Sequence, residues 1–320
     1  MNGIVPIIRK ELSDHFSSYR FTILFALIAM VSLITTYMVG IGLKEELSGV
    51  SKPQFVFLML FTSTGPLFSL VQFIAFFGPL IGLVLGFDSI NREKTSGTLS
   101  RLAAQPIYRD AIINGKFLSG VATITVMVLS IVLVVSGLGL TIIGVVPGIE
   151  ELWRLALYVV ISIFYIAFWL GVSILFSILF RGIATSALAT LALWIFFSFF
   201  VSMGATVMAN AVVPLNQQAQ QDPAMVMRHV RVQRVVSLMS PMQLYNDSTA
   251  IIIDPMRKTT RALVLMGPIE RLSSARFQRP LSLSQSVYIV IPHIITLIAV
   301  TCICFAVSYA VFMKQEIRSL

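Results

Sequence analysis

Six long stretches of the sequence carry no charged residue, and each is long enough to cross a lipid bilayer, which takes roughly 20 apolar residues. They are Phe21–Leu43, Phe55–Phe87, Phe117–Val146, Leu155–Phe180, Ile183–Met208 and Val287–Met313. Inside a bilayer only helices and closed barrels satisfy every backbone amide, and continuous apolar runs are typical of helices. The sequence therefore predicts an all-α membrane protein with six transmembrane helices that form a single domain over residues 1–320.

The composition agrees with a membrane location. The chain is 57% hydrophobic and 12% charged, whereas about a quarter of the residues in a soluble protein are charged. The second run is too long for one span. Gly65 and Pro66 are expected to break it into a short outer helix and a membrane segment near Leu67–Phe87.

The positive charges of the short loops predict the orientation, because cytoplasmic loops carry an excess of Lys and Arg. With the N-terminus inside, eleven basic residues are cytoplasmic and three lie in short outer loops, namely Lys44, Lys52 and Arg154. Nine more lie in the extracytoplasmic region 209–286, and long loops influence orientation little. We expect a multi-pass plasma-membrane protein with both termini in the cytoplasm. Its net charge of +9 then reflects topology and contact with membrane lipid, with no need for nucleic acid.

Residues 1–20 are amphipathic. The apolar side of the segment Ile4–Phe16 is formed by Ile4, Ile8, Leu12 and Phe16, and the charged residues Arg9, Lys10, Glu11 and Asp14 lie elsewhere on the helical wheel. This pattern predicts an elbow helix that lies in the membrane interface before the first span. A solvated amphipathic tail is the alternative.

Residues 88–116 form a charged island between the second and third apolar runs, with five of the chain's 23 Lys and Arg. Gly97-Thr98 can open a short helix, which Pro106 would end. We expect this cytoplasmic loop to present a short helix that docks on a soluble partner.

The extracytoplasmic region 209–286 is predicted to contain two helices. Asp222 and Pro223 suit the N-cap and first position of a basic helix over Ala224–Leu238. A second helix is expected over Pro241–Ile253. The basic surface would bind anionic lipid, an anionic cargo or an extracytoplasmic partner, or else form a solvated or lipid-facing cap.

Three glycines of the second span, Gly78, Gly82 and Gly86, form a ridge at four-residue spacing. Small residues let transmembrane helices approach closely. The ridge is therefore expected to pack either within the bundle or at a seam between two subunits.

The apolar runs lack the side chains that ion-coupled transporters and membrane-embedded enzymes use. No Asp, Glu, Lys or Arg lies deep in them, and His293 is their only histidine, whereas ion-coupled transporters need buried carboxylates or histidines. The sequence also lacks a nucleophile with its base, a metal-binding cluster and a phosphate loop, so no metal site is expected. These absences indicate a permease subunit driven by another protein. The alternatives are a membrane-embedded lipid-modifying enzyme and a non-transporting scaffold.

A pathway through such spans would be lined by aromatic, Met and small polar side chains. The candidates are Gln72, Phe73, Phe76, Phe197 and Met203. This lining suits an amphipathic or apolar cargo, because a hydrated ion would lose its water with nothing to replace it. The alternative is that these side chains simply pack or face lipid.

The charged island resembles that of the permeases of the ABC-2-type exporter family. The matching residues are Asp88, Glu93, Gly97-Thr98-Leu99, Pro106, Arg109 and Gly115-Lys116, and the segments Arg9–Leu12, Ser240-Pro241 with Tyr245, and Phe312–Arg318 also fit. The nearest branch is the permease of the nitrous-oxide-reductase maturation system, which shares Glu11–Asp14 and Gly115–Phe117. The long outer loop departs from that branch, so its cargo is not carried over.

The resemblance implies an exporter in which two permease copies, identical or related, work with two copies of a separate ABC ATPase. ATP and Mg would bind to that ATPase, and this chain would hold no cofactor. Thr98–Gln105 would form the cytoplasmic coupling helix, with Leu99 and Leu102 on the face that enters the ATPase. The residues implied in coupling are Glu93, Gly97, Thr98, Leu99, Arg101, Leu102, Pro106 and Arg109, with Glu93 and Arg101 at the rim of the contact.

Overall fold

The computed structural model describes residues 3–46, 55–62, 69–97, 108–214, 222–256 and 280–314. These residues form helices and no strand. In chain order the helices are α1 (Ile4–Phe16), α2 (Tyr19–Glu46), α3 (Val56–Thr62), α4 (Leu70–Gly86), α5 (Asn91–Thr95), α7 (Arg109–Ile143), α8 (Ile149–Leu179), α9 (Ile183–Ile195), the π-helical turn η1 (Phe196–Phe200), α10 (Val201–Val212), α11 (Pro223–Ser237), α12 (Pro241–Ile253) and α14 (Leu283–Lys314). Six helical stretches in these ranges are long and apolar enough to cross a membrane. The predicted all-α membrane fold with six spans is therefore confirmed.

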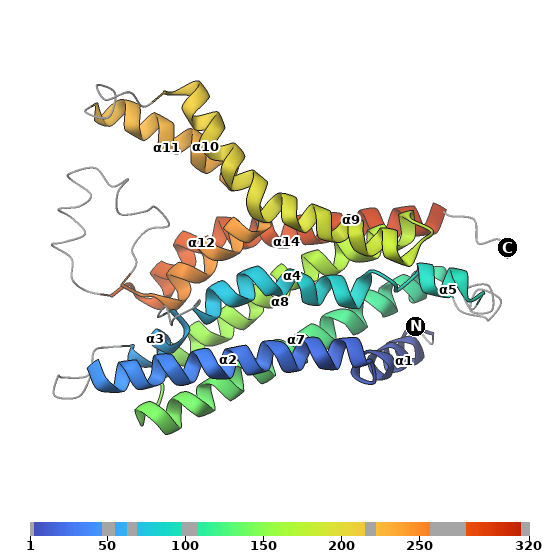
Figure 1. Ribbon diagram of the computed structural model, residues 1–320, viewed down its shortest axis with the longest axis horizontal. Coiled ribbons are helices and arrows are strands. Elements are labelled where there is room, and N and C mark those ends of the chain that lie inside the picture. The colour runs from blue at the N-terminus through green and yellow to red at the C-terminus, as the bar shows by residue number, and fades with distance from the viewer. Residues whose placement is uncertain are drawn as a thin grey trace.

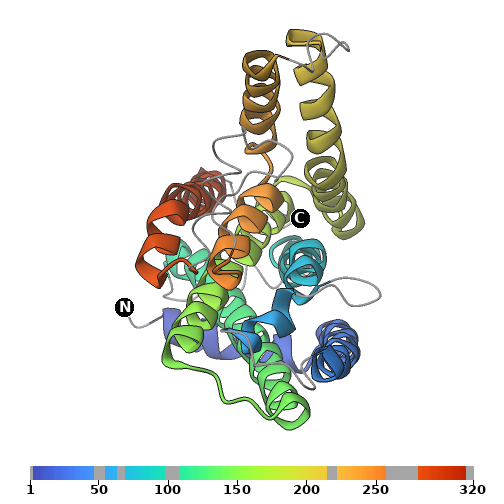
Figure 2. The ribbon, with the colours of Figure 1, turned by 90° about the vertical axis from the view of Figure 1, so that its left-hand side faces the viewer.

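The spans form an elongated bundle around α8 (Figure 1). α8 packs against α4, α7, α9, α12 and α14, and its side chains Tyr158, Tyr165 and Trp169 are completely buried. α1, α5 and the C-terminal end of α14 lie at one end of the bundle, here called the terminal end (Figure 1). The opposite end, with α3 and α12, is called the distal end. Seen along the bundle, α1 lies across the other helices (Figure 2).

The glycines of α4 face α8 within the bundle. A Cβ atom added to Gly82 would lie 2.7 Å from the carbonyl oxygen of Ile166 and 2.7 Å from the amide nitrogen of Leu170. A Cβ atom on Gly86 would lie 2.7 Å from the Cβ atom of Ser173. Gly78 faces the same helix, because a Cβ atom added there would lie 3.1 Å from Ile166 Cγ1. The ridge thus brings the two backbones together inside one chain.

α1 packs on α7 through a face that the hydrophobic pattern did not identify. Its buried side chains are Ile7 and Glu11, and a Cβ atom on Gly115 of α7 would lie 2.7 Å from Ile7 Cγ2. Ile8 is only partly buried and Phe16 is exposed, although both lie on the predicted apolar side. The side that packs on α7 includes Glu11, which is buried by its ion pairs with Lys116 and Lys10. The placement of α1 in the membrane interface stays a prediction.

A short helix that the sequence did not predict follows α4. A turn after Gly86 leads into α5, and Gly97 follows α5 with φ at +68°. This left-handed conformation favours glycine and is common just after a helix. Gly97 therefore ends α5, whereas the sequence predicted that Gly97-Thr98 opens a helix. The predicted coupling helix, Thr98–Gln105, lies outside the described residues.

The fifth span bends away from the bundle in its second half (Figure 1). The bend follows η1, where the hydroxyl of Ser240 donates a hydrogen bond of 2.9 Å to the carbonyl of Phe197. α10 continues outward and packs on α11, with the small side chains of Ala205 and Ala209 buried. We call the pair α10–α11 the arm.

The two helices predicted after the fifth span are confirmed. Asp222 caps α11 by accepting a 2.9 Å hydrogen bond from the amide of Ala224, with Pro223 in the first turn. α12 has the predicted bounds, Pro241–Ile253. Tyr245 of α12 lies 2.9 Å from the hydroxyl of Ser162 in α8, and its ring stacks on that of Tyr165. α12 is therefore built into the core of the bundle.

Arg154 joins three elements at the distal end. Its side chain is completely buried, and its Nη1 atom donates to the carbonyl of Ile252 at 2.9 Å and to the hydroxyl of Ser286 at 3.2 Å. Nη2 donates to the carbonyl of Leu281 at 2.6 Å and to Glu150 Oε1 at 2.8 Å. The sequence count had placed Arg154 in an outer loop. α8 instead begins at Ile149, because the acidic residues of its first turn suit a helix N-terminus.

Candidate coupling site

α5 is fixed to the terminal end of α8. The backbone amides of Ile90 and Asn91 both donate to the Ser177 hydroxyl, at 2.9 and 3.1 Å. The Lys94 ammonium donates to the carbonyl of Ile178 at 3.2 Å, near the C-terminus of α8. Free amides at a helix start and free carbonyls at a helix end need such partners. α5 therefore moves together with the end of α8.

A buried ionic cluster connects α5 to α1 and α7. The Lys116 ammonium lies 2.9 Å from Glu11 Oε1 and 3.0 Å from Glu93 Oε1. Only 5% of the Lys116 side chain is exposed. The ammonium of Lys10, more exposed, lies 3.1 Å from Glu11 and 3.5 Å from Glu93. One lysine of α7 thus holds a carboxylate from α1 and another from α5.

Electrostatic interactions within the cluster favour the charged forms of Glu11 and Lys10. Burial by itself would raise the pKa of Glu11, but the charge and hydrogen bond of Lys116 outweigh it and lower the pKa. Burial by itself would lower the pKa of Lys10, but the carboxylates of Glu11, Glu93 and Asp14 outweigh it and raise the pKa. Removal of one partner would therefore leave an uncompensated buried charge, which is strongly destabilising.

The structure describes three of the eight predicted coupling residues, Glu93, Gly97 and Arg109. Glu93 was expected at the rim of a partner contact, but its side chain is buried and turns inward to Lys116, because a carboxylate at this depth requires a cation. Gly97 ends α5 and Arg109 begins α7. Five other predicted residues, Thr98, Leu99, Arg101, Leu102 and Pro106, lie outside the described residues.

Sequence reasoning missed the structural roles of Lys116 and Glu11, and had treated Lys116 as a positive charge of the loop and as part of the family resemblance. The sequence position of Lys116 could have revealed its role, because its neighbours on α7, Ile112, Ile113 and Ser119, are buried. A lysine within an apolar helical face calls for an acidic partner. Its partner Glu11 is 105 residues away, too far for a local pattern.

A second charged group lies next to this cluster. Arg20 Nη1 is 3.0 Å from Asp88 Oδ2, and Arg92 Nη1 is 3.8 Å from the same oxygen. The Arg20 guanidinium also lies over the ring of Phe87, 5.4 Å from its centroid. These contacts join the start of α2 to the turn that follows α4.

The candidate pathway residues do not form a single wall. Phe76 of α4 packs edge-to-face on Trp194 and Phe199, with ring centroids 5.1 and 5.9 Å apart. Phe197 packs on Trp169 of α8. The other three differ: Phe73 is buried, Gln72 takes part in the N-cap of α4, and Met203 is 65% exposed on the arm. Only Phe76 and Phe197 lie at the junction of α4 and α8 with the fifth span.

α12 brings an ionisable group toward the histidine of the last span. Asp247 is buried and accepts a 2.9 Å hydrogen bond from Gln243 Nε2. Its Oδ2 atom lies 3.8 Å from Arg234 Nη2 and 4.0 Å from His293 Nε2. His293, the histidine of the apolar runs, therefore lies near a carboxylate and a guanidinium. The sequence placed Asp247 in an outer loop, and only the packing of α12 on α14 brings it here.

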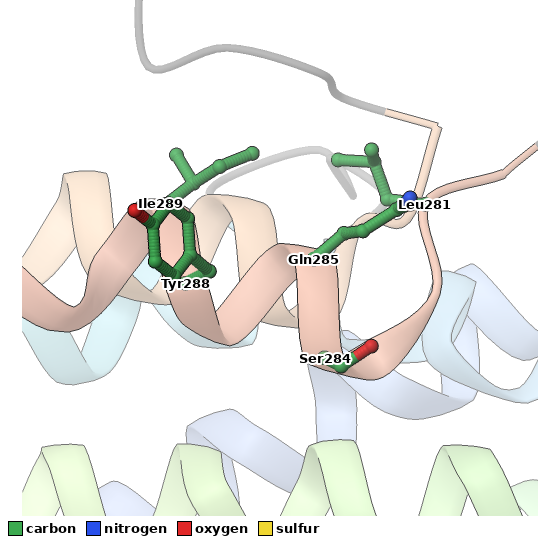
Figure 3. A pocket seen from close by; sticks show the side chains of 5 residues that line it. All are labelled: Leu281, Ser284, Gln285, Tyr288 and Ile289. Carbon is green, nitrogen blue, oxygen red and sulfur yellow. The ribbon is translucent and has the colours of Figure 1, made fainter.

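A shallow hollow lies beside the first turns of α14 (Figure 3). Its described lining consists of Leu281, Ser284, Gln285, Tyr288 and Ile289, and its volume is about 460 Å³. None of these side chains is charged at neutral pH, so the hollow offers no nucleophile with a base. Among the described residues, no group of three or more His, Cys, Asp or Glu side chains is arranged to hold a metal ion.

A family model described as ABC-2 family transporter protein matches residues 5–317. The chain belongs to this family. It is similar to the probable ABC transporter permease protein NosY of Stutzerimonas stutzeri, with 32% identity over 117 residues, which make up 37% of this chain and 38% of NosY. The matched segment thus spans less than half of that relative. As a member of this family with six candidate spans, the chain is a membrane component of an ABC transporter.

Proposed function

We propose that this ABC-2 permease is the membrane subunit of an exporter, and that a separate ABC ATPase docks on the segment 98–107. In this proposal the terminal end of the bundle faces the cytoplasm of the cell, as the distribution of positive charge favours, with eleven basic residues toward that side and three toward the other outside the long region 209–286. ATP and Mg bind to the ATPase, and this chain converts the motion of the ATPase into motion of the spans.

The single observation that carries the coupling mechanism is the buried ammonium of Lys116 between Glu11 and Glu93. α5 precedes the segment 98–107 and α7 follows it. Both flanks of the segment are thus tied to each other and to α1. A push from a docked ATPase would therefore move α1, α5 and α7 as one unit, together with the end of α8 that binds α5.

The cargo pathway is proposed to open between two permease copies, identical or related. The fifth span supports this, because Phe196, Phe199, Phe200 and Met203 are exposed on η1 and α10. Phe76 of α4 packs on Phe199 of this surface and on the buried Trp194. Aromatic and thioether side chains suit an amphipathic or apolar cargo. The arm would then lie near the extracytoplasmic exit.

Neutralising the whole cluster tests the coupling mechanism. The triple variant Lys116→Met, Glu11→Gln and Glu93→Gln keeps the side-chain volumes and leaves no buried charge without a partner. We expect it to assemble with the ATPase, with ATP hydrolysis by the complex stimulated less by cargo. Coupling free energies of about 1–3 kcal/mol predict a loss of roughly tenfold. Arg9→Met, on the exposed side of α1, is the matched control. Unchanged stimulation in the triple variant would contradict the mechanism.

A single charge tests the docking segment. Leu102→Asp would place an unpaired carboxylate in the proposed apolar contact with the ATPase. We expect it to weaken capture of the ATPase by the purified permease. Ser13→Asp adds the same charge to an exposed position of α1 at the same end of the bundle and should leave capture intact. Equal capture by both variants would exclude Leu102 from the contact.

The cargo class is tested with the reconstituted complex. Amphipathic and apolar compounds should stimulate ATP hydrolysis, and vesicles with the ATPase on the outside should accumulate them. Stimulation by small inorganic ions alone would contradict the proposed pathway. Accumulation only in vesicles of the opposite orientation would contradict the export direction.

A further inference from the structure

A polar cleft of about 860 Å³ opens at the terminal end of the bundle. Its walls are the charged side of α1, the start of α2, the junction of α4 with α5, and Lys116 of α7. Eight of its side chains carry charge, and they fall into two groups. Both groups line the same cleft, and both include a residue of α5, Arg92 in one and Glu93 in the other.

One group has a surplus of positive charge. Arg20 and Arg92 share a single carboxylate oxygen, Asp88 Oδ2, so two guanidinium groups meet one negative charge. Both arginine side chains remain largely exposed, by 61% and 72%. A guanidinium presents several donors in one plane, which suits the oxygens of a phosphate group. This group, the arginine pole, is therefore able to bind one phosphate.

The other group has a surplus of negative charge. Here the ammonium groups of Lys10 and Lys116 meet three carboxylates, those of Glu11, Glu93 and Asp14. Asp14 is the most exposed of the three, at 62%. His15 adds no charge at neutral pH, because burial lowers its pKa, and the charge of Glu11 only partly offsets this. This acidic pole is able to bind one ammonium group.

The cleft lies at the level where a bilayer surface meets the protein. α2, a predicted span, begins at Tyr19, which lines the cleft and is 85% exposed. Val84 and Leu85 of the span α4 also line it. Tyrosine at the end of a span is typical of the headgroup layer. The molecules that reach such a cleft first are the phospholipids of the adjoining leaflet.

We propose that this cleft binds the headgroup of a phospholipid with a primary amine, of the phosphoethanolamine class. The phosphate lies between Arg20 and Arg92, and the ammonium group donates hydrogen bonds to the acidic pole at Asp14. A choline headgroup has the same charges but no N–H donor. A phosphoglycerol headgroup satisfies the arginine pole only. The proposal concerns the permease alone and does not depend on the direction of transport or on the docking of the ATPase.

Lipid retention by the full-length chain tests the proposal. The purified permease is incubated in detergent with phosphatidylethanolamine, phosphatidylcholine or phosphatidylglycerol of the same acyl chains, and bound lipid is counted by native mass spectrometry. We expect phosphatidylethanolamine to be retained about tenfold better than either, because charged hydrogen bonds are worth more than about 1.4 kcal/mol. Equal retention of the ethanolamine and choline lipids would overturn the proposal.

Variants locate the site. Arg20→Gln with Arg92→Gln should weaken retention of the ethanolamine lipid, and Asp14→Asn should reduce the preference over phosphatidylglycerol. These side chains are exposed, so the fold should persist, and the melting temperature of each variant checks this. Arg9→Gln, on α1 but outside the cleft, is the control. A preference that survives both cleft variants would place the lipid elsewhere and overturn the proposal.

Soluble competitors identify the recognised group. Glycerophosphoethanolamine should displace the lipid, whereas inorganic phosphate at the same concentration should not. Displacement by inorganic phosphate to the same extent would show an anion site without recognition of the amine, and would also overturn the proposal.

Discussion

Gly82→Ala is expected to force α4 and α8 apart, because the added methyl group would meet backbone on both sides. The ideal Cβ position is 2.7 Å from the Ile166 carbonyl oxygen and 2.7 Å from the Leu170 amide nitrogen. Carbon atoms pack best at about 3.5–4.0 Å, so the helices must separate by roughly 0.8 Å. Neither neighbour is a side chain that could rotate away. The displacement must therefore spread along α4 and α8.

The size of the effect follows from packing. Inserting a methyl group into a tight contact typically costs about 1–3 kcal/mol. In a membrane the separated helices are already helical, so the change from Gly to Ala has little effect through helix propensity. The contact of α4 with α8 also holds the hydrogen bond from the Ser173 hydroxyl to the Leu83 carbonyl, at 3.0 Å. We expect this hydrogen bond to lengthen in the Gly82→Ala variant, which would further lower the free energy of unfolding.

The assay is the thermal unfolding of the purified permease in detergent, followed by the loss of monodisperse protein after heating. Gly137→Ala is the matched control, since a Cβ atom on Gly137, also within a span, would meet nothing within 4 Å. Gly82→Ala should lower the unfolding temperature by several degrees. Gly137→Ala should change the free energy of unfolding by no more than about 0.5 kcal/mol and so leave the unfolding temperature close to that of the parent. If both variants unfold at the same temperature as the parent, the inferred close approach of α4 and α8 is wrong.

Three further outcomes are expected in the same assay. Arg154→Met should destabilise the chain by about 1–3 kcal/mol for each of the carbonyls of Ile252 and Leu281, which lose their buried donor. Arg228→Met, at an exposed position of α11, should be near neutral, and equal melting of the two would refute the role of Arg154. Ser240→Ala should lower the free energy of unfolding by about 1 kcal/mol, because it removes the donor to the Phe197 carbonyl. Ser202→Ala on α10 should not lower it by this amount. A neutral Ser240→Ala would show that the bend does not depend on this hydroxyl. Burial opposes the ionised form of Glu11, but the charges of Lys116 and Lys10 lower its pKa overall from 4.5. Its ion pairs therefore stabilise the fold fully well above pH 4.5, and the stabilisation is lost as the pH falls from there through the lowered pKa. Melting measured from pH 7 to about pH 3 should show a smaller decline in Glu11→Gln than in the parent, and parallel curves would refute the assignment.

Local sequence signals predicted the spans well. Each apolar run marks a helix by itself, since the bilayer thickness fixes the length and the absence of water fixes the helical hydrogen bonding. The helix starts at Asp222-Pro223 and Ser240-Pro241 were also local, because a cap and a proline act within one turn. The same reasoning found the glycine ridge of α4. It did not decide between a contact with α8 and one with another subunit.

The ionic contacts could not be predicted in this way. Lys116 finds Glu11 and Glu93 on two other helices, and Arg154 finds its acceptors on the elements around α12 and α14. In both cases the sequence showed a charge next to an apolar run and assigned it to a loop. The pairing depends on helix packing over long sequence separations, which no window of residues contains. The segment 98–107, central to the proposed docking, remains a prediction from sequence and family resemblance.

Arg154 also has a consequence for how the chain is made. Its acceptor Ile252 is synthesised 98 residues later and its acceptor Leu281 127 residues later. At roughly 5–20 residues per second, the guanidinium waits about 6–25 s for the second of them. Glu150, four residues before Arg154, is the partner that is already present during that interval. The distal end of the bundle can therefore close only after the last span has entered, and a ribosome stalled before Leu281 should leave α8 exposed to the quality-control proteases of the membrane.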